Sequence, residues 1–124
     1  MKLLLDTHVF LWWRLDSRRL RRAARETIAT GEIVWVSAAS AWEIAIKRTL
    51  GRLTLDEPFQ SMVEDSDFSA LDITCAHAER TGVLPAHHTD PFDRMLVAQA
   101  LVEGATLMTH DRRLQAYDVP IFWT

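Results

Sequence analysis

The residues best suited to chemistry in this sequence are acidic side chains that lie where one predicted segment meets the next. Asp6 and Asp111 each follow a short apolar run, while Glu43 and Asp93 lie in the first turns of helical segments. If the apolar runs are parallel strands, the junctions after them meet at one edge of the sheet. Gathered carboxylates need a cation to stay ionised, and Mg²⁺ or Mn²⁺ prefers oxygen ligands. The pattern therefore predicts a divalent-metal site built from Asp6, Glu43, Asp93 and Asp111.

Each acid taken alone also fits a helix cap. Asp6 and Asp111 are placed to cap the turns that follow them, and Ser40 and Glu43 have the spacing of a capping box. Asp90 stands directly before a proline, the pattern of an N-cap followed by Pro at the first helical position. We therefore expect Asp90 to be a cap or, at most, an accessory metal ligand. Capping gives no reason for acids at successive strand ends, so the set of four favours metal binding.

Polar neighbours of these acids are candidates for substrate contact, namely Ser40, Lys47, Arg94 and Thr109. Lys47 also has the i, i+4 spacing of a surface ion pair with Glu43, and Arg94 would equally serve to balance the acids or the helix surface. Hydroxyl groups here would also fix carboxylate rotamers. The five histidines have no metal-binding spacing, so surface or packing roles are expected for His87 and His88, and only His110 lies beside a predicted ligand.

Apolar runs alternate with helical patterns along the chain. Strands are predicted over 2–5, 33–36, 68–72, 105–108 and 119–122, and helices over 9–13, 18–30, 41–50, 58–65, 75–81 and 91–103. This alternation is typical of an α/β fold in which helices cover both faces of a parallel sheet. We expect one domain, 1–124, a three-layer α/β/α sandwich with a central, mainly parallel sheet of four or five strands. Pro120 makes the last strand an edge strand.

The charge distribution is uneven. The net charge is −3, which argues against nucleic-acid binding, yet residues 1–25 contain seven basic and two acidic side chains. On a helix over 18–30, four arginines would share one face suited to phosphate or to an acidic partner segment: Arg18, Arg21, Arg22 and Arg25. The lone Cys75 excludes an internal disulfide, and no apolar run suggests a signal peptide or membrane span, so a cytoplasmic protein is expected.

Four segments resemble the PIN domain family, specifically its VapC-type ribonuclease toxins, and they occur in the family's order. They are LLLDTHVFLWW, SAASAWEIAIKRTLGRL, HHTDPFDRMLVAQALVEGATLMTHD and VPIFW. The resemblance implies a Mg²⁺-dependent endoribonuclease, a cytoplasmic toxin that a cognate antitoxin silences. It identifies Asp6, Glu43, Asp93 and Asp111 with the family's acidic quartet. It also implies a homodimer that meets DNA only through the antitoxin, with interface residues among Trp12, Trp13, Arg18 and Arg22.

The implied reaction is hydrolysis of an RNA phosphodiester by a metal-activated water. Asp6 and Asp93 would be the primary ligands, and Asp111 and Glu43 would bind a second ion, hold metal waters or assist deprotonation. One ion and two ions both fit. A phosphotransfer receiver would need a lysine near the end of the chain, and the only lysines are Lys2 and Lys47. A non-catalytic PIN-like nucleic-acid-binding module is the other alternative, and it would be expected to lack some of the acids.

Overall fold

The computed structural model describes residues 1–124 and contains a single five-stranded sheet. The strands are β1 (Lys2–Leu5), β2 (Ile33–Ser37), β3 (Ser69–Leu71), β4 (Thr106–Thr109) and β5 (Ile121–Trp123). The helices are α1 (Thr7–Arg14), α2 (Arg22–Ala29), α3 (Ala38–Thr49), α4 (Phe59–Asp65), α5 (Cys75–Thr81) and α6 (Pro91–Glu103), with a short 3₁₀ helix η1 (Arg112–Ala116) before β5. No helix combines the length and hydrophobicity needed to cross a membrane.

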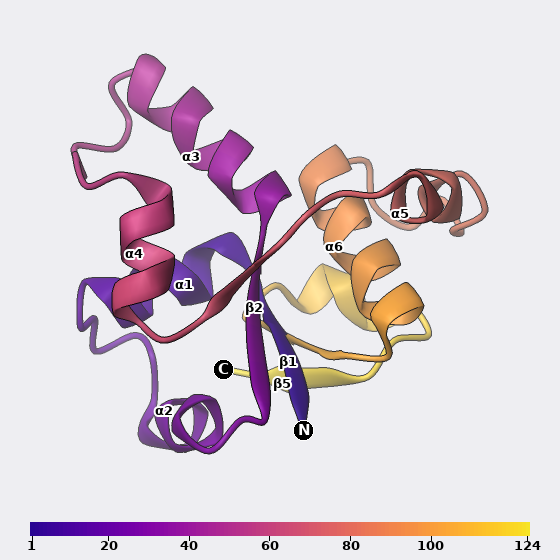
Figure 1. Cartoon of the computed structure of the whole chain (residues 1–124). Coiled ribbons are helices and arrows are strands. Elements are labelled where there is room, and N and C mark those ends of the chain that lie inside the picture. The colour runs from indigo at the N-terminus through magenta and orange to yellow at the C-terminus, as the bar shows by residue number, and fades with distance from the viewer.

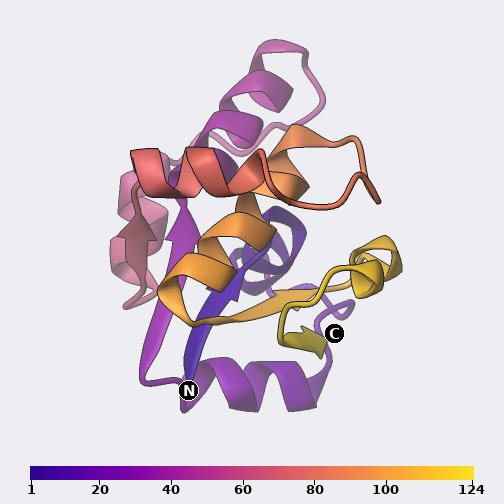
Figure 2. The same cartoon turned by 90° about the vertical axis from the view of Figure 1, so that its right-hand side faces the viewer.

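All four strand pairings are parallel, in the order β3-β2-β1-β4-β5. Helices α1, α2 and α4 lie on one side of the sheet and α5 and α6 on the other, and α3 extends beyond the ends of the strands (Figure 1). The view turned by 90° shows α6 lying across the strands (Figure 2). The predicted α/β/α sandwich is therefore confirmed, and its sheet is entirely parallel.

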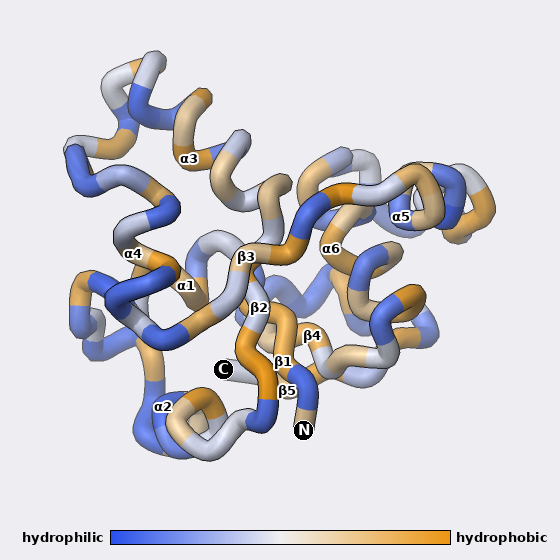
Figure 3. Tube along the Cα trace, viewed as in Figure 1, coloured by the Kyte–Doolittle hydropathy of each residue, from blue (hydrophilic) through white to orange (hydrophobic).

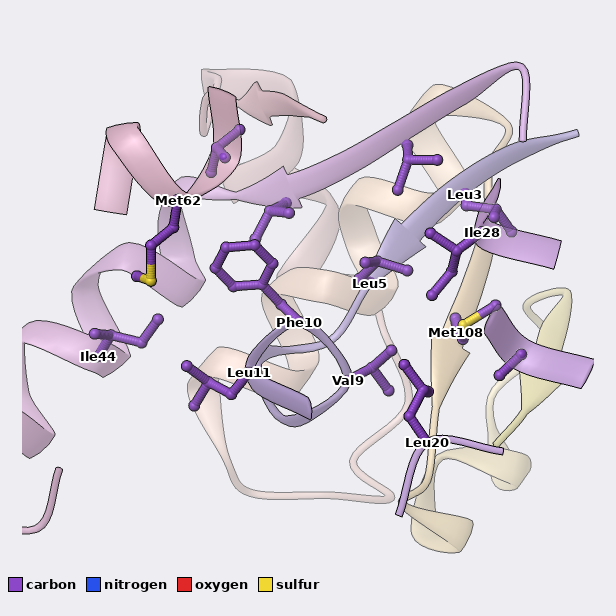
Figure 4. Packing of buried hydrophobic residues seen from close by; sticks show 14 residues of the cluster. Leu3, Leu5, Val9, Phe10, Leu11, Leu20, Ile28, Ile44, Met62 and Met108 are labelled. Atoms are coloured by element: carbon purple, nitrogen blue, oxygen red, sulfur yellow. The ribbon is translucent and has the colours of Figure 1, made fainter. Parts of the chain in front are cut away.

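Each face of the sheet buries its own apolar cluster. Leu3 and Leu5 of β1 point into a cluster with Phe10 of α1, whereas Leu4 points to the opposite face, against α6. This alternation follows from the period of two in a strand. Figure 4 shows the first cluster, in which the Phe10 ring lies among side chains contributed by β1, α3 and α4. Figure 3 shows the matching distribution of hydropathy, with hydrophobic residues concentrated in β1, β2 and β4.

The topology places a crevice at the carboxyl end of the central strands. From β1 the chain moves to β2 and β3 on one side, and it later returns to β4 and β5 on the other side. Leu5 is in register with Val36 and with Met108, so the residues that follow β1, β2 and β4 emerge together. The point where the strand order reverses is the usual ligand site of open α/β sheets. Here that point lies between Asp6, after β1, and Asp111, after β4.

Several helix boundaries differ from the prediction, and two of the differences overturn a predicted feature. The helix predicted over 18–30 begins only at Arg22, because residues 15–20 form turns that Arg25 holds through bonds to the carbonyls of Leu20 (3.0 Å) and Ser17 (2.6 Å). Arg18 is therefore outside the helix, and the four arginines do not share a helical face. The predicted capping box at Ser40 is wrong, because α3 begins three residues earlier. Its N-cap is Ser37, whose hydroxyl accepts from the backbone N–H of Ala39.

Candidate metal centre

Asp6 is a buried carboxylate at the junction of β1 and α1. Its Oδ1 accepts from the backbone N–H of Val9 at 2.8 Å, so it is the N-cap of α1. Its Oδ2 accepts from the Thr109 hydroxyl at 2.5 Å, which ties the end of β1 to the end of β4. Burial raises the pKa of Asp6, against the opposing effect of these hydrogen bonds. The cap role of Asp6 is therefore confirmed, and a cation beside this buried carboxylate would stabilise its charged form.

Asp93, in the first turn of α6, lies in the same electrostatic environment. Burial raises the pKa of Asp93 to about 7, and the charges of Asp90, Asp111 and Asp6 add to the shift. Asp90 is the N-cap of α6, and its Oδ1 accepts from the backbone N–H groups of Phe92 (2.8 Å) and Asp93 (3.2 Å). The cap expected for Asp90 is confirmed, and the site gathers Asp6, Asp93 and Asp111 from three different junctions.

Asp111 differs from the other two acids because a cation already faces it. Arg113 donates to Oδ1 through Nε at 2.9 Å and to Oδ2 through Nη2 at 2.7 Å. The Arg113 hydrogen bonds lower the pKa of Asp111 to about 2. Asp111 also caps η1 by accepting from the backbone N–H of Arg113. The Arg113 side chain is mostly exposed, so this cation faces Asp111 from the solvent side.

His88 is the site residue that the sequence did not identify, since a loop histidine without a spaced partner gives no signal. Its Nε2 is buried and lies 3.1 Å from Asp93 Oδ2 and 3.6 Å from Asp111 Oδ2, without the angles of a hydrogen bond. Its Nδ1 accepts from the backbone N–H of Asp90 at 3.1 Å, which puts the proton of a neutral ring on Nε2. In that tautomer the Nε2 N–H lies close to both carboxylates.

A divalent cation fits this set of residues. The carboxylates of Asp93 and Asp111 approach His88 Nε2 so closely that the three ligand atoms lie within 4.8 Å of one another. A protonated Nε2 has no lone pair for a metal, so in that tautomer the carboxylates would be the ligands and His88 would be the group that orients them. The raised pKa values of Asp6 and Asp93 reflect buried negative charge without enough cationic charge beside it. Carboxylate oxygens are the ligands that Mg²⁺ and Mn²⁺ prefer.

Glu43 stands apart from the three aspartates. Its Oε2 pairs with Lys47 Nζ at 3.3 Å, so the i, i+4 ion pair considered for Lys47 is present. One turn earlier on α3, Ser40 accepts from the Thr7 hydroxyl at 2.8 Å, and this bond fixes α3 against the start of α1. No direct contact joins Glu43 to Asp6, Asp93 or Asp111 in the structure. The inclusion of Glu43 in the metal site remains a prediction.

Three of the four predicted substrate contacts have other roles. Thr109 is 0% exposed and Ser40 is 1% exposed, so neither hydroxyl can reach a substrate, and both instead fix neighbouring groups. Arg94 donates to the carbonyls of Pro85 (2.8 Å) and Thr81 (2.7 Å), which secures the loop before α6. Lys47 keeps a partly exposed ammonium beside Glu43 and stays a candidate for substrate contact.

The tryptophans differ in burial, and the predicted interface residues Trp12 and Trp13 are not the most exposed of them. Trp12 and Trp13 are half-buried and diverge, with Trp13 against Phe68 (centroids 5.6 Å apart) and Trp12 against His110 (5.4 Å). The exposed tryptophan is Trp42, at 62%, and it shares one face of α3 with Ile46 (38%) and Leu50 (59%). We call these three residues the α3 apolar face.

Comparison with known proteins places this geometry in a family. The model of the PIN domain family matches residues 3–120. Ribonuclease VapC22 of Mycobacterium tuberculosis (strain ATCC 25618 / H37Rv) is 33% identical over 120 residues, which cover 94% of this chain and 92% of that protein. Among solved structures, VapBC2 from Rickettsia felis bound to a promoter DNA fragment matches with a TM-score of 0.73 at 14% identity, over 98% of both chains. DNA-bound VapBC from Salmonella typhimurium matches with a TM-score of 0.72 at 19% identity, over 98% of this chain and 97% of that one.

Proposed function

This chain belongs to the PIN domain family, and on that premise we propose that it is a Mg²⁺-dependent endoribonuclease that acts as the toxin of a toxin–antitoxin pair. The observation that carries the proposal is the convergence of Asp6, Asp93 and Asp111 at the strand-order reversal of the sheet. The name of the similar protein from M. tuberculosis, a ribonuclease, supports RNA as the substrate.

Asp6, Asp93 and Asp111 would hold the cation through carboxylate oxygens. When bound, Mg²⁺ or Mn²⁺ would lower the pKa of a water and offset charge on the phosphodiester. Thr109 and the backbone N–H of Val9 fix the rotamer of Asp6, so one orientation of its carboxylate is already selected. His88 Nε2 lies between Asp93 and Asp111 and would help to orient both, and Asp90 fixes the first turn of α6. Exposed Arg113 would leave Asp111 to the cation and is then free to contact a phosphate.

Cleavage of single-stranded RNA in the presence of Mg²⁺ tests this function. We expect Asp6→Asn and Asp93→Asn to lower the rate at least about a hundredfold, because a metal ion contributes several kcal/mol to stabilising the transition state. Both substitutions preserve shape and remove buried charge, so the variants should stay folded. Asp90→Asn is the matched control, since asparagine also caps helices and should leave the rate within a few-fold of wild type.

Equal cleavage by wild type and Asp6→Asn, or by wild type with and without EDTA, would overturn the metal-dependent mechanism. In cells, Asp6→Asn also distinguishes a ribonuclease toxin from a non-catalytic nucleic-acid-binding module. Expression of the wild-type chain without a partner should arrest growth, and Asp6→Asn should relieve the arrest. Growth arrest that persists with Asp6→Asn would instead support a non-catalytic nucleic-acid-binding module.

We further propose the partners of a cytoplasmic toxin, namely an antitoxin protein and a second copy of this chain. The similar solved structures include VapBC assemblies bound to DNA, which supports contact with DNA through the antitoxin. The α3 apolar face is an exposed apolar surface suited to the second copy, and it lies outside the predicted interface residues Trp12, Trp13, Arg18 and Arg22. Arg18 is exposed and Arg22 pairs with Glu26 at 2.9 Å on the surface, so both remain accessible to an acidic segment.

A further inference from the structure

A pocket of about 400 Å³ lies beside the candidate metal centre and shares two of its carboxylates. Asp6 and Asp111 line one part of it, and its walls also include Trp12 of α1, Arg19 of the following turn and Arg112 of η1. We call it the Trp12 pocket. Its volume is within the ~300–1,000 Å³ of pockets that hold small molecules, which is enough for one nucleotide.

Trp12 gives this pocket an aromatic surface in a fixed orientation. Its indole lies edge to face against His110, with centroids 5.4 Å apart, and tilted against His8 at 6.3 Å. Both imidazoles line the same pocket, and Trp12 also packs against the apolar cluster beneath α1. Aromatic side chains held in this way serve as stacking surfaces for the bases of single-stranded nucleic acids, whatever the base.

Two exposed arginines give the pocket a cationic part that the metal chemistry does not use. Arg112 lies with its guanidinium carbon 4.4 Å from the centroid of the Trp123 ring, which holds the side chain over η1 and β5. Arg19 projects from the turn after α1. Guanidinium groups suit bidentate contact with phosphate oxygens. The pocket therefore joins metal-binding carboxylates, an aromatic ring and two phosphate-binding groups.

We propose that the Trp12 pocket binds the nucleotide next to the scissile phosphate of single-stranded RNA, with its base stacked on Trp12. Arg19 and Arg112 contact the phosphate on the far side of that nucleotide. This assignment rests on the proposed function and adds to it the path that the RNA strand takes away from the metal centre. RNA is favoured over a protein segment because Asp6 and Asp111 line the same pocket, so its occupant must lie against the reacting centre.

Cleavage kinetics with a fluorescently labelled ten-nucleotide single-stranded RNA test the stacking role. Trp12→Leu should raise KM about 5- to 100-fold, the loss expected for one base stack, and leave kcat within a few-fold. Trp12→Phe keeps an aromatic ring and should recover most of the affinity. Trp13→Leu is the matched control on the next residue of α1, because Trp13 packs against Phe68 away from this pocket, and it should lower stability without raising KM.

A second measurement uses the wild-type protein, so it does not depend on whether a variant folds. In a series of the same RNA with one abasic position each, the wild-type protein should lose about 5- to 100-fold in affinity at one position next to the cleaved bond. Trp12→Leu should be insensitive to loss of that base. If Trp12→Leu fails to fold, the wild-type abasic series alone decides the proposal.

An unchanged KM for Trp12→Leu, equal effects of Trp12→Leu and Trp13→Leu, or an abasic series without a sensitive position would overturn this assignment. The proposed function would survive each of those results, because the wild-type chain would still cleave RNA. Normal RNA cleavage by Trp12→Leu together with loss of inhibition by the antitoxin would assign the pocket to protein docking and also overturn it. Absence of any Mg²⁺-dependent RNA cleavage by the wild-type protein would overturn the proposed function itself.

Discussion

Asp93 is about half protonated at neutral pH in the metal-free protein, since burial raises its pKa to about 7 from an ordinary value near 3.8. A carboxyl whose pKa is raised by folding stabilises the folded state below pH 4, and this contribution is lost as the pH rises to 7. In EDTA, raising the pH from 4 to 8 should therefore lower the free energy of unfolding of the wild type relative to that of Asp93→Asn. We expect a relative change of about 1–2 kcal/mol, allowing for solvent screening, measured by urea denaturation at both pH values.

Metal binding should reverse that loss. Adding Mn²⁺ at pH 8 should stabilise the wild-type protein and leave Asp93→Asn nearly unaffected, because the cation binds the ionised carboxylate. A difference between the two proteins that is the same at pH 4 and pH 8 would contradict the raised pKa of Asp93.

His88 is expected to act through the acids that it positions. His88→Ala should lower metal affinity or kcat about 10- to 100-fold, the usual effect of removing a group that orients metal ligands. The measurement is a Mn²⁺ titration of RNA cleavage. His87→Ala is the control, because His87 is an exposed neighbour that packs edge to face on Tyr117, with centroids 5.3 Å apart. Identical Mn²⁺ dependence in wild type and His88→Ala would exclude a positioning role.

At the scale of residues, the sequence predicts acids better than their partners. Asp6, Asp93 and Asp111 could be identified because each lies at a segment junction. In a parallel sheet the junctions after the strands lie close together at one edge. His88 and Arg113 reach the site through loop and side-chain conformations that leave no periodic signal. Thr109 was predicted beside the ligands as a substrate contact. It is buried and its hydroxyl binds Asp6 instead, and this burial depends on tertiary packing that local sequence does not reveal.

At the scale of elements, every predicted strand and helix exists, and the errors lie at their ends. The residue types that favour an N-cap occur at both Ser37 and Ser40, so local pattern could not choose between them. The choice is tertiary, because Ser40 accepts from buried Thr7 across 33 residues and Ser37 is left to begin α3. The late start of α2 has a similar cause, since Arg25 folds back onto the preceding turn.

The α3–α1 contact also explains how a helix that projects from the sheet is kept in place. Ser40 and Thr7 are both buried, and Ile44 of α3 reaches the same apolar cluster as Phe10 of α1 (Figure 4). The inward face of α3 is thereby fixed, while its apolar face remains outside. That division of one helix into an anchored side and an exposed apolar side is what a contact between two molecules requires.

At the scale of the whole molecule, we expect the α3 apolar face to mediate self-association. Leu50→Glu, at a position 59% exposed in the single chain, should convert a dimer to a folded monomer. Sedimentation equilibrium at micromolar concentrations measures the change. Ala23→Glu, at an exposed position of α2 away from the α3 apolar face, adds the same charge and is the control for charge alone. A wild-type chain that is monomeric at these concentrations would contradict the prediction.

The parallel sheet also decides which end of the chain tolerates an attachment. β5 runs in the same direction as β1 and β4, and the backbone N–H of Thr124 donates to the carbonyl of Thr109 at 3.1 Å. The carbonyl of Thr124 in turn lies 3.1 Å from His110 Nδ1. Anything fused after Thr124 would therefore emerge at the rim of the Trp12 pocket and obstruct RNA. Met1 lies at the opposite edge, so affinity tags and immobilisation linkers belong there.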